Sequence, residues 1–313
     1  MQHVLKMTVL LLLTCQSGLA EELSSLELPS PFGRIASNGY FPAWTPDGAN
    51  IVYGSTGNVG YDVWIAPSQG GQARRLTHNG GYHPAVSRDG ITLSYDERGR
   101  GGRIVTRPLW GGGADEVVPL TTTGNFSSWG PDALHVVFAS NGDIWRVSLD
   151  GGNAKKIISL QGEDTRPCWS PDGSKIVFDS RGANEGDNFD IWLYDVAGKK
   201  TVRLTQHTGR DIQASWSPDG KMITFMSERS GNMDIWIMTA DGTGKRQITT
   251  VPGSDVWPRW SPDGGKLAFG SDRAGSMDIW VVDLDTLLAN DYAAGQVNQK
   301  AGLYISAARQ LVL

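Results

Sequence analysis

The chain has 313 residues, including 40 glycines and 15 prolines, and 39% of its residues are hydrophobic. This composition excludes a disordered low-complexity chain and leaves room for one large all-β domain or two ordinary domains. The 33 acidic residues outnumber the 28 basic ones, for a net charge of −5, which argues against a nucleic-acid partner and against binding to anionic membranes.

The first 20 residues have the layout of a secretory signal peptide. Lys6 precedes an apolar run over residues 7–13, and Gly18 and Ala20 supply small side chains before a cleavage point. The run is too short to cross a bilayer, and no other segment approaches 18 apolar residues, so no transmembrane span is predicted. We therefore expect a periplasmic or secreted protein. Cys15 leaves a lipoprotein anchor open as an alternative.

The N-terminal segment is followed by six copies of one unit of about 43 residues. Its first landmark, Trp-Ser-Pro-Asp-Gly, is clearest at 169–173, 216–220 and 260–264. Its second landmark, Asp-Ile-Trp, recurs at 190–192, 234–236 and 278–280, and a Leu-Thr pair such as 204–205 ends several copies.

Each copy contains four short runs of strand length. The Pro and Gly of the first landmark predict a turn that joins two strands in a hairpin, and Ile235 and Ile237 show the two-residue period of a strand. Four strands per unit, repeated six times, predict an all-β, six-bladed β-propeller over residues 21–285. The recurring tryptophans should pack between blades.

The sixth copy lacks its last strand, because the pattern stops after Asp283. Near the N-terminus, residues 34–36 stand before Tyr40 as residues 75–77 stand before Tyr82. We therefore predict that residues 32–37 supply the missing outer strand and close the ring. Residues 286–313 form a C-terminal tail outside the repeat, for which a short helix and an alternative edge strand are both open.

The succession of Trp-Ser-Pro-Asp-Gly, Ser-x-Arg-x-Gly, Asp-Ile-Trp and Leu-Thr resembles the WD40-like propeller repeat of the TolB family. The Ser-x-Arg-x-Gly motif stands at 227–231 and 271–275. The resemblance spans roughly residues 32–285 and implies a stand-alone propeller, because too few residues follow the predicted signal peptide for the α/β domain that precedes the TolB propeller.

This resemblance implies a non-catalytic protein-binding or scaffold module in the bacterial cell envelope. Its partner would be an envelope protein or peptide, for which a Pal-like lipoprotein is a candidate. The alternative is a carbohydrate-active enzyme (a lyase or a glycosidase) or a glycan-binding propeller. No Gly-x-Ser-x-Gly motif is present to position a nucleophile.

Residues just before the first strand of each copy differ between copies, so we expect them to surround the mouth of the central channel. From these we select six candidate binding residues: Tyr82, His83, Arg166, Asp211, Asp255 and Trp257. The aromatic members can stack on a sugar or on a partner's side chain, and the others can form hydrogen bonds.

No catalytic residue, cofactor or metal site is assigned. The five histidines are scattered along the chain, and no His/Cys spacing matches a zinc site. The arginines of the Ser-x-Arg motif, Arg229 and Arg273, are instead expected to pair with Asp234 and Asp278 of their own blades.

Overall fold

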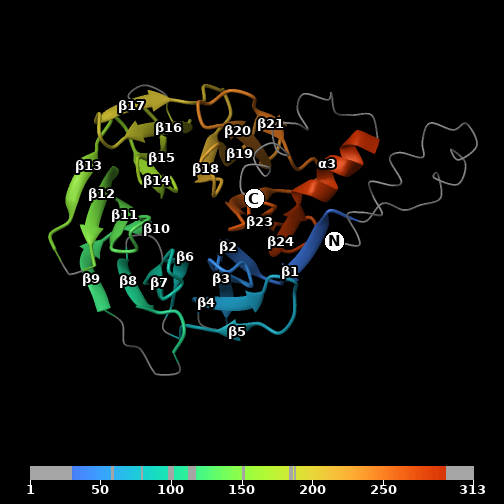
Figure 1. Cartoon of the computed structure of the whole chain (residues 1–313), viewed down its shortest axis with the longest axis horizontal. Coiled ribbons are helices and arrows are strands. Elements are labelled where there is room, and N and C mark those ends of the chain that lie inside the picture. Colours follow the sequence, from blue (N-terminus) through green and yellow to red (C-terminus); the bar gives the residue numbers. More distant parts are fainter. Residues whose placement is uncertain are drawn as a thin grey trace, which may run out of the picture.

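The computed structural model describes residues 30–57, 60–78, 80–97, 102–111, 118–149, 152–182, 186 and 188–293. In this part of the chain, six four-stranded antiparallel sheets stand as blades around a central channel (Figure 1). The prediction of an all-β, six-bladed propeller is confirmed. The predicted signal peptide of residues 1–20, with Cys15, lies outside the described residues.

Five blades consist of four consecutive strands, ordered from the channel outwards. The first two blades are β2 (Gly39–Trp44), β3 (Asn50–Gly57), β4 (Gly60–Pro67), β5 (Arg74–Arg75), and β6 (Tyr82–Val86), β7 (Thr92–Asp96), β8 (Arg103–Pro108), β9 (Val118–Thr123). The next three are β10 (Asn125–Trp129), β11 (His135–Ser140), β12 (Asp143–Ser148), β13 (Lys155–Ile158); β14 (Asp164–Trp169), β15 (Lys175–Ser180), β16 (Asp190–Asp195), β17 (Lys200–Arg203); and β18 (Asp211–Trp216), β19 (Met222–Ser227), β20 (Asp234–Thr239), β21 (Arg246–Gln247).

The sixth blade joins the two ends of the chain. It consists of β22 (Asp255–Trp260), β23 (Lys266–Ser271) and β24 (Asp278–Asp283), with β1 (Phe32–Ala36) as its outer strand (Figure 1). Phe32 pairs with Val282 and Arg34 with Trp280 in an antiparallel register. The predicted closure by an N-terminal strand is confirmed. Helix α3 (Leu284–Ala293) follows β24 directly.

The first landmark forms the turn between the two inner strands of a blade. Ser170 donates from its hydroxyl to Asp172 at 2.6 Å and accepts the Lys175 N–H at 2.9 Å. Gly173 follows with a φ of +72°, a conformation that glycine adopts at no steric cost. A Cβ at Gly173 would lie 2.8 Å from Pro131 of the preceding blade, so this turn also packs against its neighbour.

The second and third landmarks bind each other. Thr205, in the Leu-Thr pair, donates to the Asp190 carboxylate at 2.9 Å and accepts the Ile191 N–H at 2.9 Å. Arg203 completes the group with a contact of 2.5 Å to Asp190. These landmarks therefore hold the third strand of a blade to the segment that follows the fourth.

The predicted pairs of the Ser-x-Arg arginines are wrong. Arg229 binds Asp211 at 2.5 Å and Arg273 binds Asp255 at 2.9 Å, at the start of the innermost strand of each blade. Ser227 and Ser271 orient the two guanidinium groups through their hydroxyl oxygens, each accepting from Nε at 2.9 Å. The motif thus connects the end of the second strand of a blade to the start of its first strand.

The core lies between the blades. Four phenylalanines on second strands are fully buried: Phe138, Phe178, Phe225 and Phe269. Trp216 of the fifth blade packs in one cluster with Val177 and Ile191 of the fourth, as predicted for the recurring tryptophans. In the described residues no helix is long and apolar enough to cross a membrane.

Candidate functional site

Each innermost strand carries a bulge at the same place, where its register to the second strand shifts. One residue in each bulge has a positive φ, between 46° and 61°: Phe41, His83, Phe126, Arg166, Gln213 and Trp257. The left-handed conformation costs a non-glycine residue about 1 kcal/mol. Bulges of this kind change the direction of a side chain, and five of these six line the central cavity.

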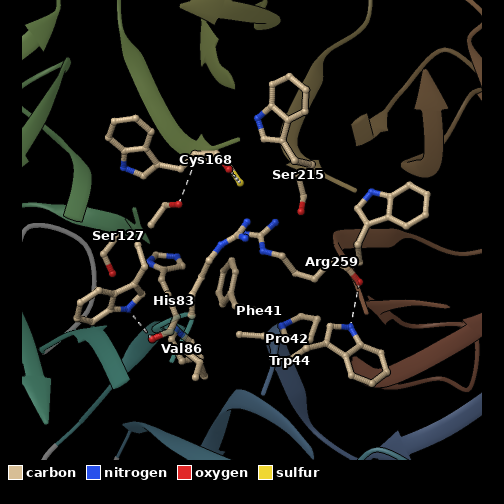
Figure 2. A pocket seen from close by; sticks show the side chains of 18 of the residues that line it. Phe41, Pro42, Trp44, His83, Val86, Ser127, Cys168, Ser215 and Arg259 are labelled. Atoms are coloured by element: carbon tan, nitrogen blue, oxygen red, sulfur yellow. Dashed lines mark hydrogen bonds between the residues drawn. The ribbon is translucent and has the colours of Figure 1, made fainter. Parts of the chain in front are cut away.

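The central cavity has a volume of 440 Å³. It extends from the bulge residues to the first-landmark turns, where Pro46, Arg88, Pro218 and Pro262 line it. Figure 2 shows Phe41, His83, Cys168, Ser215 and Arg259 converging on it from different blades. The lining contains no Asp or Glu among the described residues, although the whole chain is acidic.

His83 is buried in the cavity wall and bound to a carboxylate. Its Nδ1 lies 2.5 Å from Asp96 on β7, and the same Asp96 oxygen accepts the Phe126 N–H of the next blade at 3.3 Å. Burial raises the pKa of Asp96 well above its ordinary value, while the bond from Phe126 lowers it. The pair holds the imidazole in place and joins two blades.

Arg166 repeats this arrangement two blades further on. Its Nη1 lies 3.0 Å from Asp179 on β15, and Asp179 also accepts the backbone N–H of Gln213 in the next blade at 3.0 Å. Burial raises the pKa of Asp179 to about 6, against the lowering effect of the Arg166 charge. The guanidinium also lies 5.2 Å from the Phe126 ring centre, within cation–π range.

Five aromatic side chains from three blades, Phe41 among them, are in contact, and we call this group the aromatic cluster. Its members are Tyr40, Phe41, Tyr61, Tyr82 and Trp257, all half-buried. Ring centres lie 4.1 Å apart for Phe41 and Trp257, 4.8 Å for Phe41 and Tyr82, and 4.4 Å for Tyr61 and Tyr82. Of the five, only Phe41 also lines the cavity. Burial, with the nearby Tyr61 and Asp278, raises the pKa of Tyr40.

The six predicted binding residues therefore divide into three places. Tyr82 and Trp257 lie in the aromatic cluster, and His83 and Arg166 line the cavity. Asp211 and Asp255 are buried and bound to the Ser-x-Arg arginines, so the structure does not bring them to the channel surface with the others. In the part of the chain that the structure describes, no group of three or more potential metal ligands is found.

The six selected residues did not include Tyr61, Gln213, Arg88 or Arg259. Tyr61 is the second residue of β4, just after a connection between strands that varies in sequence between copies. Arg88 and Arg259 did carry a signal in the repeat. Arg88 stands where the other five copies have proline, and Arg259 stands where the other five copies have a small residue.

The family model of the Tricorn protease N-terminal β-propeller domain matches residues 187–299 of the chain. No curated protein matches the chain. Among solved structures, a TolB structure from Agrobacterium tumefaciens is similar with a TM-score of 0.62 at 19% identity, over 79% of this chain and 90% of that one. TolB from Acinetobacter baumannii gives 0.64 at 22% identity, over 82% of this chain and 62% of that one. The chain thus has a TolB-like propeller fold.

An oligogalacturonate lyase from Vibrio parahaemolyticus is also similar, with a TM-score of 0.55 at 14% identity. The alignment covers 82% of this chain and 92% of the lyase. The same blade architecture therefore occurs in proteins with different names, and at these identities the likeness concerns the fold alone.

Proposed function

We propose that this propeller is a non-catalytic binding module of the bacterial cell envelope that takes a protein or peptide partner on the aromatic cluster. One observation carries the proposal: five aromatic side chains from three blades touch one another and remain partly exposed. Partly exposed tyrosine and tryptophan side chains in contact are typical of the residues that dominate the affinity of protein interfaces.

The surroundings of the cluster support binding more than catalysis. Asp278, whose charge raises the pKa of Tyr40 in the cluster, is bound to Arg34 at 3.0 Å. Asp96 and Asp179, which lie behind the cavity wall, are buried and bound to His83 and Arg166. Asp211 and Asp255 are bound to arginines in the same way. The similarity in fold to TolB structures and the predicted signal peptide support an envelope location.

A glycan-binding or carbohydrate-active propeller is the second candidate. Aromatic rings also stack on the apolar faces of sugars, and the similarity in fold to an oligogalacturonate lyase favours this class. It requires that an oligosaccharide bind, or be cleaved, at the same cluster.

The test compares wild type with Trp257→Ala and with Trp110→Ala, whose tryptophan is 52% exposed in the second blade and outside the cluster. A protein recovered from envelope extracts by the wild type is purified, and its Kd is measured for all three forms. We expect Trp257→Ala to weaken binding at least tenfold (about 1.4 kcal/mol or more) and Trp110→Ala to leave it unchanged. Equal binding by all three forms would refute the site, whereas turnover of an oligosaccharide panel would establish the second candidate.

A further inference from the structure

The central cavity contains a positive charge that no described residue neutralises. Arg259 on β22 extends into the cavity (Figure 2), and its Nη1 donates to the Pro258 carbonyl at 3.0 Å. Among the described residues, no carboxylate lies within ion-pair distance of this guanidinium. Burial by the channel walls lowers the pKa of Arg259, with opposing effects of Cys168 and Asp179, but an arginine remains protonated in proteins.

The repeat identifies Arg259 as an exception to what the fold requires. The equivalent position in the other five blades carries a small residue: Ala43, Ala85, Ser128, Cys168 and Ser215. Packing of the inner strand therefore does not call for a long cationic side chain there. A half-buried charge without a partner is available to a ligand that supplies the opposite charge.

A second exception lines the same cavity. Arg88 stands in the first-landmark turn of the second blade, where the other five blades have proline. Its side chain is exposed, and it makes no ion pair with the described residues. Arg88 thus places a second positive charge at the end of the cavity that reaches the first-landmark turns.

Two buried polar side chains that line the same cavity also have no side-chain hydrogen bond to the described residues. Gln213 and Ser215 lie on β18 of the adjacent blade, are 4% and 5% exposed, and line the cavity. The Gln213 amide and the Ser215 hydroxyl form no hydrogen bond with the described residues, and Figure 2 shows Ser215 directed into the cavity. Buried polar groups normally have a hydrogen-bond partner, so both are available to a ligand.

The charged side chains that line the cavity favour the binding of one anionic group at Arg259. His83 and Arg166 are each bound to a buried aspartate, and no acidic residue lines the cavity in the described part of the chain. We infer that the cavity binds the carboxylate of a small monocarboxylic acid, held by the Arg259 guanidinium with the Ser215 hydroxyl and the Gln213 amide as further donors. The planar guanidinium matches a carboxylate in shape and in its hydrogen-bonding pattern.

The rest of such a ligand would meet an apolar wall. Ala43, Ala85, Val86 and Phe126 line the cavity, and its volume of 440 Å³ suits a small molecule. Arg88 and the prolines of the first-landmark turns line the end of the cavity away from the bulge residues. Apart from Phe41, no member of the aromatic cluster lines the cavity, so the two proposed sites share one residue.

The test uses sodium hexanoate and its neutral analogue hexanamide, titrated into the full chain and followed by NMR. We expect one hexanoate per chain and at least tenfold weaker binding of hexanamide. Arg259→Met should weaken hexanoate binding at least tenfold, and Arg88→Ala should weaken it two- to fivefold. Arg74→Ala, which removes an exposed arginine on β5 outside the cavity lining, should leave it unchanged.

Two further variants keep the inference testable if Arg259→Met fails to fold. Arg259→Lys retains the charge without the planar guanidinium, and Ser215→Ala removes one hydrogen-bond donor. Each variant should weaken hexanoate binding, but by less than the tenfold expected for Arg259→Met. Equal affinities for hexanoate and hexanamide, unchanged binding in Arg259→Lys and Ser215→Ala, or tighter binding of inorganic phosphate than of hexanoate would overturn the assignment.

The source of the carboxylate is decided by a second titration. A short acetylated peptide with a free C-terminal carboxylate is compared with its C-terminal amide. Tighter binding of the free peptide than of hexanoate assigns the site to a chain terminus, and weaker binding assigns it to a free acid. Trp257→Ala should keep hexanoate binding, so a failure at the aromatic cluster and a failure in the cavity give different results.

Discussion

Closure of the ring by β1 offers a direct test of how this propeller is stabilised. Phe32 packs edge-on against Phe269, with ring centres 6.3 Å apart, and lies 4.5 Å from the guanidinium of Arg273. Truncation of a fully buried Phe to Ala costs about 3–5 kcal/mol. Because Phe32 is only partly buried, we expect Phe32→Ala to cost about 2 kcal/mol, which corresponds to a fall in Tm of roughly 4–8 °C.

A chain that begins at Ser37 loses the whole strand, including the contact of 3.0 Å between Arg34 and Asp278. Its Tm should fall further than that of Phe32→Ala, because the edge of β24 becomes unpaired. Thermal melts followed by circular dichroism measure both variants. Val202→Ala, at an exposed position on the outer strand of the fourth blade, is the matched control and should change stability by less than about 0.5 kcal/mol. A Tm of the shortened chain within about 2 °C of the full chain's would refute the role of β1.

Two further predictions concern buried positions. The folded-state pKa of Asp179, about 6, lies above its ordinary value of 3.8. Between these two pH values the folded protein holds a proton that the unfolded chain has lost. The free energy of unfolding of wild type, relative to that of Asp179→Asn, should therefore fall by up to about 3 kcal/mol as pH rises from 4 to 7. Urea unfolding at several pH values measures this difference, and a difference independent of pH would contradict the assignment. A Cβ at Gly124 would lie 2.5 Å from Phe138 Cδ2, so Gly124→Ala should cost about 1–3 kcal/mol. Gly33→Ala, where no atom lies within 4 Å of the added Cβ, should be near neutral in the same unfolding assay.

The repeat made the architecture readable from the amino-acid sequence. Its turns, strand periods and Asp-Ile-Trp and Leu-Thr landmarks depend on neighbours along the chain or on the next strand, such as the Thr205 contact with Asp190. The incomplete sixth copy and the extra strand-like segment near the N-terminus were sufficient to predict that β1 completes the last blade, because a propeller leaves only one place for it.

The partners of the arginines could not be chosen in the same way. Arg229 stands five residues before Asp234 in the chain, yet it binds Asp211, 18 residues away. Both carboxylates lie near the same end of the blade, and the choice depends on the direction in which the side chain leaves β19. Sequence spacing does not determine that direction.

The candidate site also depends on tertiary structure. Trp257 and Phe41 are far apart in the chain, and their rings meet at 4.1 Å only because closure of the ring places the first blade beside the sixth. The bulge that gives each of these residues a positive φ is likewise set by pairing with the second strand. Composition and repeat pattern thus determined the 24 described strands and their order, whereas the curvature of the closed ring decided which side chains share the channel.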